Sequence, residues 1–302
     1  MPAYNHEKYI SQAIESVLAQ KTNYPYELLI HDDCSADSTL TIAQDYATKY
    51  PDKIKLFTEK ENQGLMKSYK RLIEQSKGKY LAILESDDYW LDKNKLQIQI
   101  DFLENNPDYG IVAGDIITID DEGNEIKKGG FNSDKASTDF WYTKLLGLSG
   151  FEGACAIIFR RDLFNTYCNI NDYIDLGFKT FDQPTWLSIS YHSKCKVIPR
   201  ILAAYRHTST SLSNNIFFEK HIDFILNIIE IEKYIIEKYG LNGITQNEYN
   251  NRISFIIMGK ALKFHKLKLF CEYAKKLKPI SIKQKFMHFF PHLYYWQFII
   301  RH

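Results

Sequence analysis

Two clusters of polar, mostly acidic residues follow short apolar runs of the chain. The cluster His31–Asp33 comes after Tyr26–Ile30, and the cluster Glu85–Asp88 comes after Tyr80–Leu84. Short apolar runs that end in polar residues are typical of buried strands. In a parallel α/β sheet, ligands bind beyond the carboxyl ends of the strands, so the two clusters would meet at one edge. Because hard divalent cations prefer carboxylate ligands, the acids predict an active site that suits such a cation.

Each cluster alone has a simpler interpretation, because Asp and Ser are also favoured helix caps and turn residues. Ser35 or Asp37 is such a cap candidate for the segment after the first cluster. The occurrence of acids after two separate strands favours a ligand site over two unrelated caps.

Helical and extended apolar patterns alternate around these clusters. The expected helices are Glu7–Gln20 with Asn5 as its N-cap, a second helix that reaches about Tyr50, Leu65–Ser76 and Lys93–Asn105, and the expected strands are Tyr26–Ile30, Ile54–Phe57, Tyr80–Leu84 and Gly110–Ile119. This order predicts an α/β fold in which a mostly parallel sheet is flanked by helices on both faces.

The alternation loosens after residue 120. The expected elements there are a hairpin turn at 120–124, a helix at Asp182–Tyr191, a short strand at Lys196–Ile198 and a long amphipathic helix at Phe217–Tyr239 that ends at Gly240. We therefore divide the chain into a domain at 1–214, which carries the acids, and a helical region at 215–302.

Charge is distributed unevenly. The formal net charge is +1, yet residues 252–302 hold eleven Lys or Arg residues and one acid, Glu272. A basic tail on an acidic body favours an anionic partner, which could be a membrane surface, nucleic acid or another subunit. Aromatic residues among the cations of 283–302 suit a membrane interface, although a helix docked on the domain at 1–214 explains them equally well. No nucleic-acid-binding motif is present, so nucleic acid is not expected as a partner.

Cysteine usage indicates the compartment. The five cysteines are odd in number and none has C-x-x-C spacing, which argues against a disulfide framework and a zinc site. No apolar run reaches transmembrane length, and no signal peptide is recognisable. We expect a cytoplasmic protein, held peripherally at the inner face of the membrane if the tail binds lipid.

Three motifs resemble those of family 2 glycosyltransferases with a GT-A fold. They are the segments 1–7 (Met-Pro-Ala-Tyr-Asn-His-Glu), 31–39 and 85–90. Tyr205-Arg206-His207, followed by Ser211 and Ser213, is similar to a further segment of the family, and the resemblance covers residues 1–213. It implies a Rossmann-like GT-A fold and an inverting transfer of a sugar from a nucleotide-sugar to a hydroxyl acceptor.

The resemblance also implies roles for individual residues. Asp33 would accept a hydrogen bond from the base, usually uracil, and Pro2, Ala3 and Tyr4 would pack against that base. The implied donor-binding residues are Pro2, Ala3, Tyr4, Glu7, Asp33, Lys67, Ser86 and Asp87, the implied metal residues are Asp87 and Asp88, and Glu85, Arg206 and His207 are further candidates. Mg²⁺ or Mn²⁺ at the acids would neutralise charge on the departing diphosphate.

Asp182 resembles the family's catalytic base. It stands at the expected start of a helix, where amide groups and the helix dipole favour the charged carboxylate. The same position suits a simple N-cap, so both interpretations stay open. Asp172 and Asp175 are the alternative candidates for the base.

Members of the family normally have an apolar strand before the Pro-x-Tyr-Asn segment, and this sequence begins at Met1. We expect that strand to belong centrally in the sheet, beside Tyr26–Ile30, and to be encoded upstream, because an empty central position would leave backbone groups unsatisfied.

The resulting functional hypothesis is a metal-dependent glycosyltransferase of surface polysaccharide synthesis, with UDP favoured by family habit. Its expected partners are a nucleotide-sugar and a glycan or lipid-linked glycan acceptor. The alternative hypothesis is a non-catalytic relative that binds nucleotide or another protein without turnover.

Overall fold

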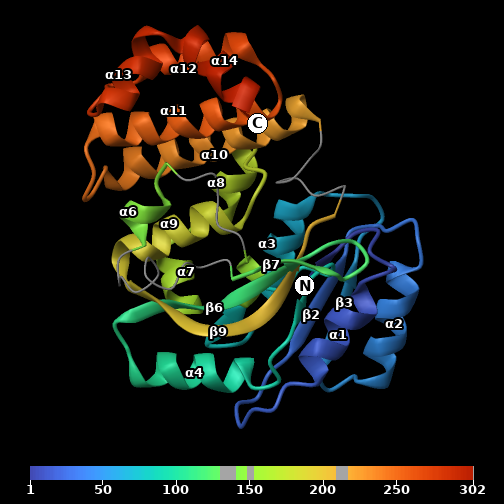
Figure 1. Cartoon of the computed structure of the whole chain (residues 1–302). Helices are drawn as coiled ribbons and strands as arrows, with labels where there is room; N and C mark the ends of the chain where they lie inside the picture. Colours follow the sequence, from blue (N-terminus) through green and yellow to red (C-terminus); the bar gives the residue numbers. More distant parts are fainter. Residues whose placement is uncertain (130–140, 148–152, 209–216, 302) are drawn as a thin grey trace. The chain divides into compact units, whose positions relative to one another are not determined.

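The structure is a computed structural model that describes the whole chain except residues 130–140, 148–152, 209–216 and 302. The described residues form two compact units (Figure 1). Unit 1 comprises Met1–Trp141 with Glu152–Thr208, and unit 2 comprises Tyr142–Phe151 with Ser209–His302. Unit 2 therefore includes a short segment from inside the range 1–214. The division into a domain at 1–214 and a helical region at 215–302 stays a prediction.

The strands are β1 (Pro2–Ala3), β2 (Leu28–Asp32), β3 (Ile54–Thr58), β4 (Tyr80–Ala82), β5 (Tyr89–Trp90), β6 (Tyr109–Ile119), β7 (Glu125–Lys128), β8 (Ile157–Arg160) and β9 (Lys194–Arg206). The helices of unit 1 are α1 (Ile10–Leu18), α2 (Thr39–Lys49), α3 (Leu65–Gln75), α4 (Lys95–Asn105), the 3₁₀ helix η1 (Ala154–Ala156), α7 (Arg161–Tyr167), α8 (Ile170–Asp175) and α9 (Asp182–His192). Those of unit 2 are α6 (Tyr142–Leu145), α10 (Phe218–Tyr239), α11 (Gln246–Lys263), α12 (Leu267–Lys276), α13 (Ile282–Phe289) and α14 (Pro291–Arg301).

Unit 1 contains two sheets. The order of the first is β1-β2-β3 with parallel pairing throughout, as predicted for the early strands. The order of the second is β4-β8-β6-β9-β5, with β7 paired to β6 in the expected hairpin. Pairing in the second sheet is mixed, because β6 and β9 run parallel while β8 runs antiparallel to both β4 and β6. The predicted α/β class with helices around the sheets is confirmed.

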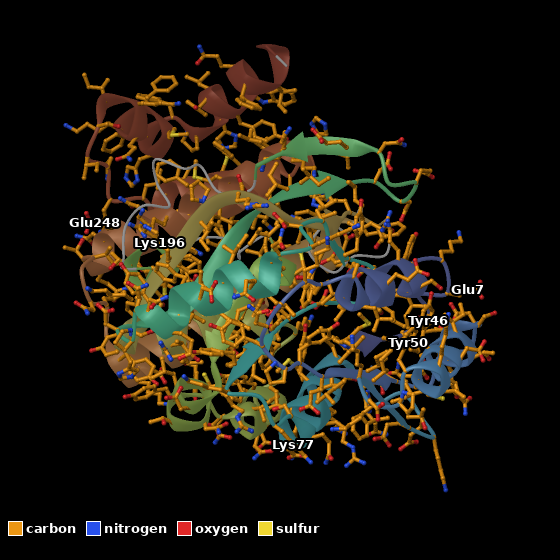
Figure 2. The ribbon with its side chains drawn as sticks, turned by 90° about the horizontal axis from the view of Figure 1, so that it is seen from below. Glu7, Tyr46, Tyr50, Lys77, Lys196 and Glu248 are labelled. Carbon is orange, nitrogen blue, oxygen red and sulfur yellow. The ribbon has the colours of Figure 1, made fainter. Side chains whose placement is uncertain are left out.

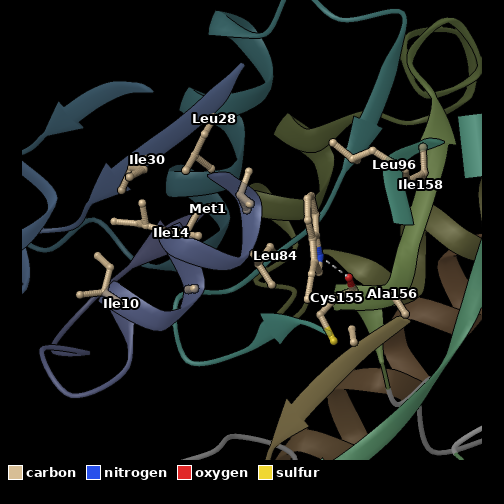
Figure 3. Packing of buried hydrophobic residues seen from close by; sticks show 14 of the residues in the cluster. Met1, Ile10, Ile14, Leu28, Ile30, Leu84, Leu96, Cys155, Ala156 and Ile158 are labelled. Atoms are coloured by element: carbon tan, nitrogen blue, oxygen red, sulfur yellow. Dashed lines mark hydrogen bonds between the residues drawn. The ribbon is translucent and has the colours of Figure 1, made fainter. Parts of the chain in front are cut away.

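Helix α1 shows why these helices form and where the sequence prediction erred. Ile10, Ala13, Ile14 and Val17 recur at helical spacing and are almost fully buried. Figure 3 shows Ile10 and Ile14 in the core of unit 1. Asn5 does not cap this helix, because its side chain accepts a hydrogen bond from Ala36 N in the neighbouring loop (2.8 Å). The prediction of Asn5 as N-cap is wrong, and the helix begins at Ile10.

Strand β9 is much longer than the expected segment Lys196–Ile198. Its 13 residues pair with β6 along nearly the whole length of that strand, and its last residues also pair with β5. Pro199 interrupts the apolar pattern, and the register against β6 shifts next to it. Pairing with two neighbours therefore extends a strand that the local pattern shows only in part.

The two sheets are separated between β2 and β4, which are not paired with each other. The prediction that both acidic clusters follow strands of one parallel sheet is wrong, because β2 and β4 belong to different sheets. A cavity of about 630 Å³ lies there, lined by Leu28 and Leu29 of one strand and by Tyr80–Ala82 of the other. The amino group of Met1 donates to Leu29 O (2.8 Å) at its border. The expected strand before Pro2 stays a prediction.

Unit 2 is built from helices with apolar inner faces. Ile225, Ile229 and Ile257 join α10 to α11, and Met258, Phe270 and six further buried residues join α11 to α14. A capping box of Thr245 and Glu248 starts α11, and Figure 2 labels Glu248 at the surface. Among the residues that the structure describes, no helix has both the length and the apolar character needed to cross a bilayer.

Candidate active site

The first loop of the chain and the loop after β2 hold each other in place. Besides the bond from Ala36 N to the Asn5 side chain, Asn5 N donates to Ser35 Oγ (3.0 Å), and His6 N donates to Thr39 Oγ1 (2.8 Å). Asn5 has a φ of 54°, a left-handed conformation that Asn tolerates better than most residues. These bonds fix the backbone of His6.

His6 connects this loop to the acids after β4. Its Nδ1 lies 2.7 Å from Ser86 Oγ, and its Nε2 lies 4.0 Å from Asp87 Oδ2. Burial raises the pKa of Asp87, and the proximity of His6 and Arg206 partly offsets that rise. The first and third sequence motifs therefore meet in space, and His6, to which sequence reasoning gave no role, makes the contact.

Three carboxyl groups crowd the end of β4. Burial, followed by repulsion from Asp87, raises the pKa of Glu85 to about 7. Burial and the neighbouring acids raise the pKa of Asp88 well above its ordinary value. Acids that disfavour one another's charge form a site that gains free energy by taking up a cation or a proton.

Arg206 holds the acidic segment in place through hydrogen bonds. Its backbone N donates to Asp88 Oδ1 (2.8 Å), and its Nε donates to Asp87 O (2.9 Å). The rest of the guanidinium donates to the carbonyls of Asp120 and Asp121 and to Gln12 Oε1. Because Arg206 is 4% exposed and bonded on every nitrogen, this geometry favours a positioning role over direct donor contact.

The carboxylate of Asp33 is also hydrogen-bonded to the protein backbone. Its Oδ1 accepts from Gln63 N (2.8 Å) and its Oδ2 accepts from Gly64 N (2.7 Å), which fixes the start of α3. Lys67 on that helix donates to Gln63 Oε1 (3.0 Å) and is exposed. The proposed contact of Asp33 with a base would use remaining lone pairs of a carboxyl group that is 3% exposed.

The other expected donor residues differ in exposure. Pro2 and Ala3 are buried in β1, whereas Tyr4 is 46% exposed. Glu7 accepts a hydrogen bond from Ser38 N (2.9 Å), and Figure 2 shows it at the outer edge of the molecule. Tyr4 and Glu7 therefore have side chains that are accessible to a ligand, whereas Pro2 and Ala3 do not.

Asp182 lies at the first position of α9. Its Oδ1 accepts hydrogen bonds from Gln183 N (2.7 Å) and from the Thr180 hydroxyl. The expectation that the helix start would favour the charged form is not met: burial raises the pKa of Asp182, and the two bonds reverse only part of the rise. The charge of Asp182 acts on Tyr69 and Glu85, and Tyr69 donates to Glu85 Oε1 (3.0 Å).

Three other predicted residues lie elsewhere or were not described. His207 follows β9, and its backbone N donates to Ile119 O (2.8 Å). Its ring lies edge-on to Tyr205. Ser211 and Ser213 lie outside the described residues.

The acids fit a divalent cation that takes only part of its ligands from the protein. Among the described residues, no group of three or more His, Cys, Asp or Glu side chains is arranged to hold a metal ion. Asp87 Oδ1 is buried and has no hydrogen-bond partner within the described parts of the chain. A cation bound at Asp87 would complete its shell with ligand oxygens, as Mg²⁺ commonly does with phosphates.

A buried lysine lies behind the site and was not predicted. Lys95 of α4 is fully buried, and its Nζ stands 4.4 Å from the centre of the Trp90 ring. Burial lowers the pKa of Lys95 to about 7, and Cys155 raises it slightly. Cys155 in turn interacts with Asp88. The charge of a lysine normally predicts a surface position, so the pattern of α4 held no signal for this placement.

Comparison with known proteins identifies the family. The family model described as Glycosyl transferase family 2 matches residues 1–167. This chain belongs to that family. The match includes the loop of His6 and the acids after β4.

A family 2 relative from Escherichia coli aligns over most of both chains. It is "UDP-Glc:alpha-D-GlcNAc-diphosphoundecaprenol beta-1,3-glucosyltransferase WfgD", 31% identical over 262 residues, which is 83% of this chain and 94% of the relative. Other curated relatives match over a smaller share of their length, and the match covers only 35% of the length of the mycobacterial ones.

Solved structures share the fold. The complex of S. aureus TarS 1-349 with UDP-GlcNAc has a TM-score of 0.62 and 16% identity, over 91% of this chain and 80% of that one. The mannosyltransferase PcManGT of Pyrobaculum calidifontis, in complex with GDP-Man and Mn²⁺, has a TM-score of 0.51 and 15% identity, over 96% of this chain and 86% of that one. At these identities the likeness establishes the fold and the GT-A class of the family 2 chain.

Proposed function

We propose that this family 2 chain is a metal-dependent inverting glycosyltransferase that moves a sugar from a nucleotide-sugar, with UDP as the nucleotide, to a hydroxyl acceptor. One observation carries the proposal: Tyr69 donates to Glu85 Oε1 (3.0 Å), two residues before Asp87, and its ring stacks on Phe181, which precedes Asp182. The segments that carry the candidate metal ligand and the candidate base, from distant parts of the sequence, therefore meet at Tyr69. Inverting transfer requires a cation site and a separate base.

Asp87 is the residue proposed to contact the metal, because its Oδ1 is buried without a partner in the described chain. Asp88, whose Oδ1 accepts a hydrogen bond from Arg206 N, would add negative charge next to the bound metal. A cation here would stabilise the charge that develops on the departing diphosphate. The Mn²⁺ in the PcManGT complex supports this proposal.

Asp182 is proposed as the base. Its carboxylate would take the proton from the acceptor hydroxyl while the acceptor oxygen bonds to the anomeric carbon and the nucleoside diphosphate leaves with the electrons of the broken bond. The raised pKa of Asp182 strengthens it as a proton acceptor. Its bonds to Gln183 N and Thr180 would orient the carboxylate.

The acceptor is proposed to be a glycan carried on a lipid diphosphate, as the name of WfgD states for that relative. Tyr4, which is 46% exposed beside β1, is proposed to pack against the base of the donor. The process that such a transfer serves would be the assembly of a surface polysaccharide.

A donor panel tests this function. UDP-, GDP- and dTDP-sugars are added to the full chain with Mn²⁺, with Mg²⁺ or with EDTA, and the melting temperature and the release of free nucleotide are measured. We expect a UDP-sugar to raise the melting temperature only when metal is present. At a free donor concentration [L], the free energy of unfolding should increase by RT ln(1 + [L]/Kd). We also expect slow release of free UDP from that donor. Equal activity in EDTA would remove the metal from the proposal.

The alternative, a relative of the family without turnover, is supported by one feature. Both oxygens of Asp33 are already bonded to Gln63 N and Gly64 N, which leaves little of that carboxyl group for a donor. Stabilisation by UDP without release of UDP from any sugar donor, with acceptor present, would favour this alternative.

A further inference from the structure

Unit 2 presents several large apolar side chains to solvent within residues 280–296. They belong to α13, α14 and their flanks, and we call them the outer face: Ile280, Ile282, Phe286, Phe289, Phe290, Leu293 and Trp296, with exposed fractions from 38% to 87%. Groups of exposed large apolar side chains are typical of interaction surfaces in soluble proteins. Figure 1 shows α13 and α14 together beside α12.

The outer face is exposed although the helices are packed. Met287 of α13 and Tyr295 of α14 are 7% and 3% exposed in the core that they share with Phe270. Ile282, Phe286 and Phe289 recur at helical spacing on the side of α13 opposite Met287. Helix α13 therefore has two apolar sides, and packing within unit 2 buries only one of them.

Charges beside the outer face have one sign. Lys283 and Lys285 flank the apolar stripe of α13, one on each side in the helical projection, and both are exposed. Lys275 and Lys278 just before α13 are exposed as well. No acidic residue follows Glu272 in the sequence.

We propose that the outer face binds the surface of a bilayer that contains anionic phospholipid. Phe289 and Trp296 would enter the interfacial region, where aromatic rings are favoured. Lys283 and Lys285 would face the lipid headgroups, each adding attraction that falls off within a Debye length. The face would lie along the membrane, since no described helix is suited to cross it.

The same charges argue against a second copy of the chain as the occupant. A two-fold contact through the outer face would set the lysines of one copy against those of the other. With no acid after Glu272 in this segment, neither copy offers a compensating charge. An anionic membrane is complementary both to the apolar side chains and to the lysines.

Vesicle binding tests the proposal with the full chain and without any sugar donor, so its outcome is independent of the proposed enzyme activity. The protein is floated with vesicles of phosphatidylcholine alone and with 30% phosphatidylglycerol added. We expect binding to the anionic vesicles and a loss of at least about tenfold for the double variant Phe289→Ser/Trp296→Ser, because two buried rings are removed. Leu226→Ser, at a similarly exposed residue of α10, is the matched control and should bind normally.

A second pair of variants tests the charge. Lys283→Glu/Lys285→Glu should bind anionic vesicles about tenfold or more weakly, whereas Lys49→Glu/Lys53→Glu, exposed residues of unit 1, should keep most of the binding. Equal binding to neutral and anionic vesicles, or binding that survives both outer-face variants, would overturn the proposal. Absence of vesicle binding, with a molar mass by light scattering that halves in the Phe289→Ser/Trp296→Ser variant, would overturn it in favour of a second copy.

Tryptophan fluorescence reports the contact directly. The chain has four tryptophans, of which Trp90, Trp141 and Trp186 are at most 7% exposed and Trp296 is 53% exposed. Anionic vesicles should shift the emission to shorter wavelength and protect it from acrylamide, and the variant Trp296→Phe should lose both changes while it still binds. An unchanged wild-type spectrum with saturating anionic vesicles would contradict burial of the outer face.

Discussion

At the scale of single residues, the acids after β4 depend on a few side chains that hold them in place. His6 reaches Ser86 and Asp87 from the first loop, and Arg206 binds Asp88 through its backbone and Asp87 through its side chain. None of these contacts is local in sequence. Motif patterns could place the acids at a strand end, but only tertiary contacts show which atoms remain available to a ligand.

Replacement of His6 tests whether it prepares Asp87. The variant His6→Ala should lower metal-dependent turnover about tenfold, which corresponds to about 1.4 kcal/mol, because the acidic segment loses both the contact of Ser86 with the ring (2.7 Å) and the electrostatic contact of Asp87 with it (4.0 Å). The ring also lowers the pKa of Asp87, so its loss leaves that acid less ionised. Turnover and the melting temperature are measured together.

His6→Asn serves as the control for this prediction. Asn keeps a polar atom near the position of Nδ1, which bonds Ser86, but has none at the position of Nε2, near Asp87. The variant His6→Asn should have the melting temperature of wild type but the low turnover of His6→Ala. Wild-type turnover in His6→Ala would exclude His6 from the site.

The buried Lys95 makes stability depend on pH. Its pKa falls from 10.5 to about 7 on folding, so the charged amine costs on the order of 5 kcal/mol in the folded state. Between pH 7 and 10.5 the amine of Lys95 is protonated in the unfolded chain and neutral in the folded chain. The free energy of unfolding therefore increases as the pH rises through this range. Below pH 7 the full cost is present.

The variant Lys95→Met should therefore be more stable than wild type by roughly 5 °C or more at pH 6, and the difference should shrink as the pH approaches 10. Thermal melts of both proteins at several pH values measure this directly. A difference that is constant with pH would show that Lys95 is not buried as an isolated amine.

At the scale of helices and strands, periodic patterns were good predictors where one side of the element faces the core. The expected helices Leu65–Ser76 and Phe217–Tyr239 agree with α3 and α10 to within one residue. Strand β9 was underestimated, because pairing with β6 extends it past Pro199. Burial of Lys95 had no sequence signal, since charge type predicts exposure.

The cavity between β2 and β4 leads to a prediction about an added strand. A six-residue Val- and Ile-rich extension before Met1 should fill the space beside Leu28 and Leu29 and pair with the open strand edges. It would also remove the buried amino group, whose pKa is lowered to about 5 by burial. We expect a melting temperature several degrees higher, on the order of 2–4 °C per kcal/mol gained.

A Gly- and Ser-rich extension of the same length is the matched control, since it also converts the amino group to an amide but cannot pack in an apolar cavity. Equal melting temperatures for the two extended proteins would show that the cavity does not accept a strand.

At the scale of the whole molecule, the chain combines a unit that carries the acids with a helical unit that carries the outer face. The sequence showed that the tail is basic and aromatic, and two interpretations followed: a membrane interface, or a helix docked on the domain at 1–214. In the structure, Met287 and Tyr295 pack in the core of unit 2, of which they are part, while Phe289 and Trp296 remain exposed. A donor site on one unit and a lipid-binding face on the other would suit an enzyme whose acceptor is carried by a membrane lipid.

The central claim is that the chain transfers sugar with Asp182 as the base, and the variant Asp182→Asn tests it most directly. Asn still accepts hydrogen bonds from Gln183 N and Thr180, so the start of α9 should be preserved. The measurement is turnover of the UDP-sugar with acceptor, compared with donor binding by thermal shift in the same samples. We predict an unchanged melting temperature, unchanged donor binding and turnover lower by about a hundredfold or more. Near-normal turnover in Asp182→Asn would contradict the account and return Asp182 to the role of a helix cap.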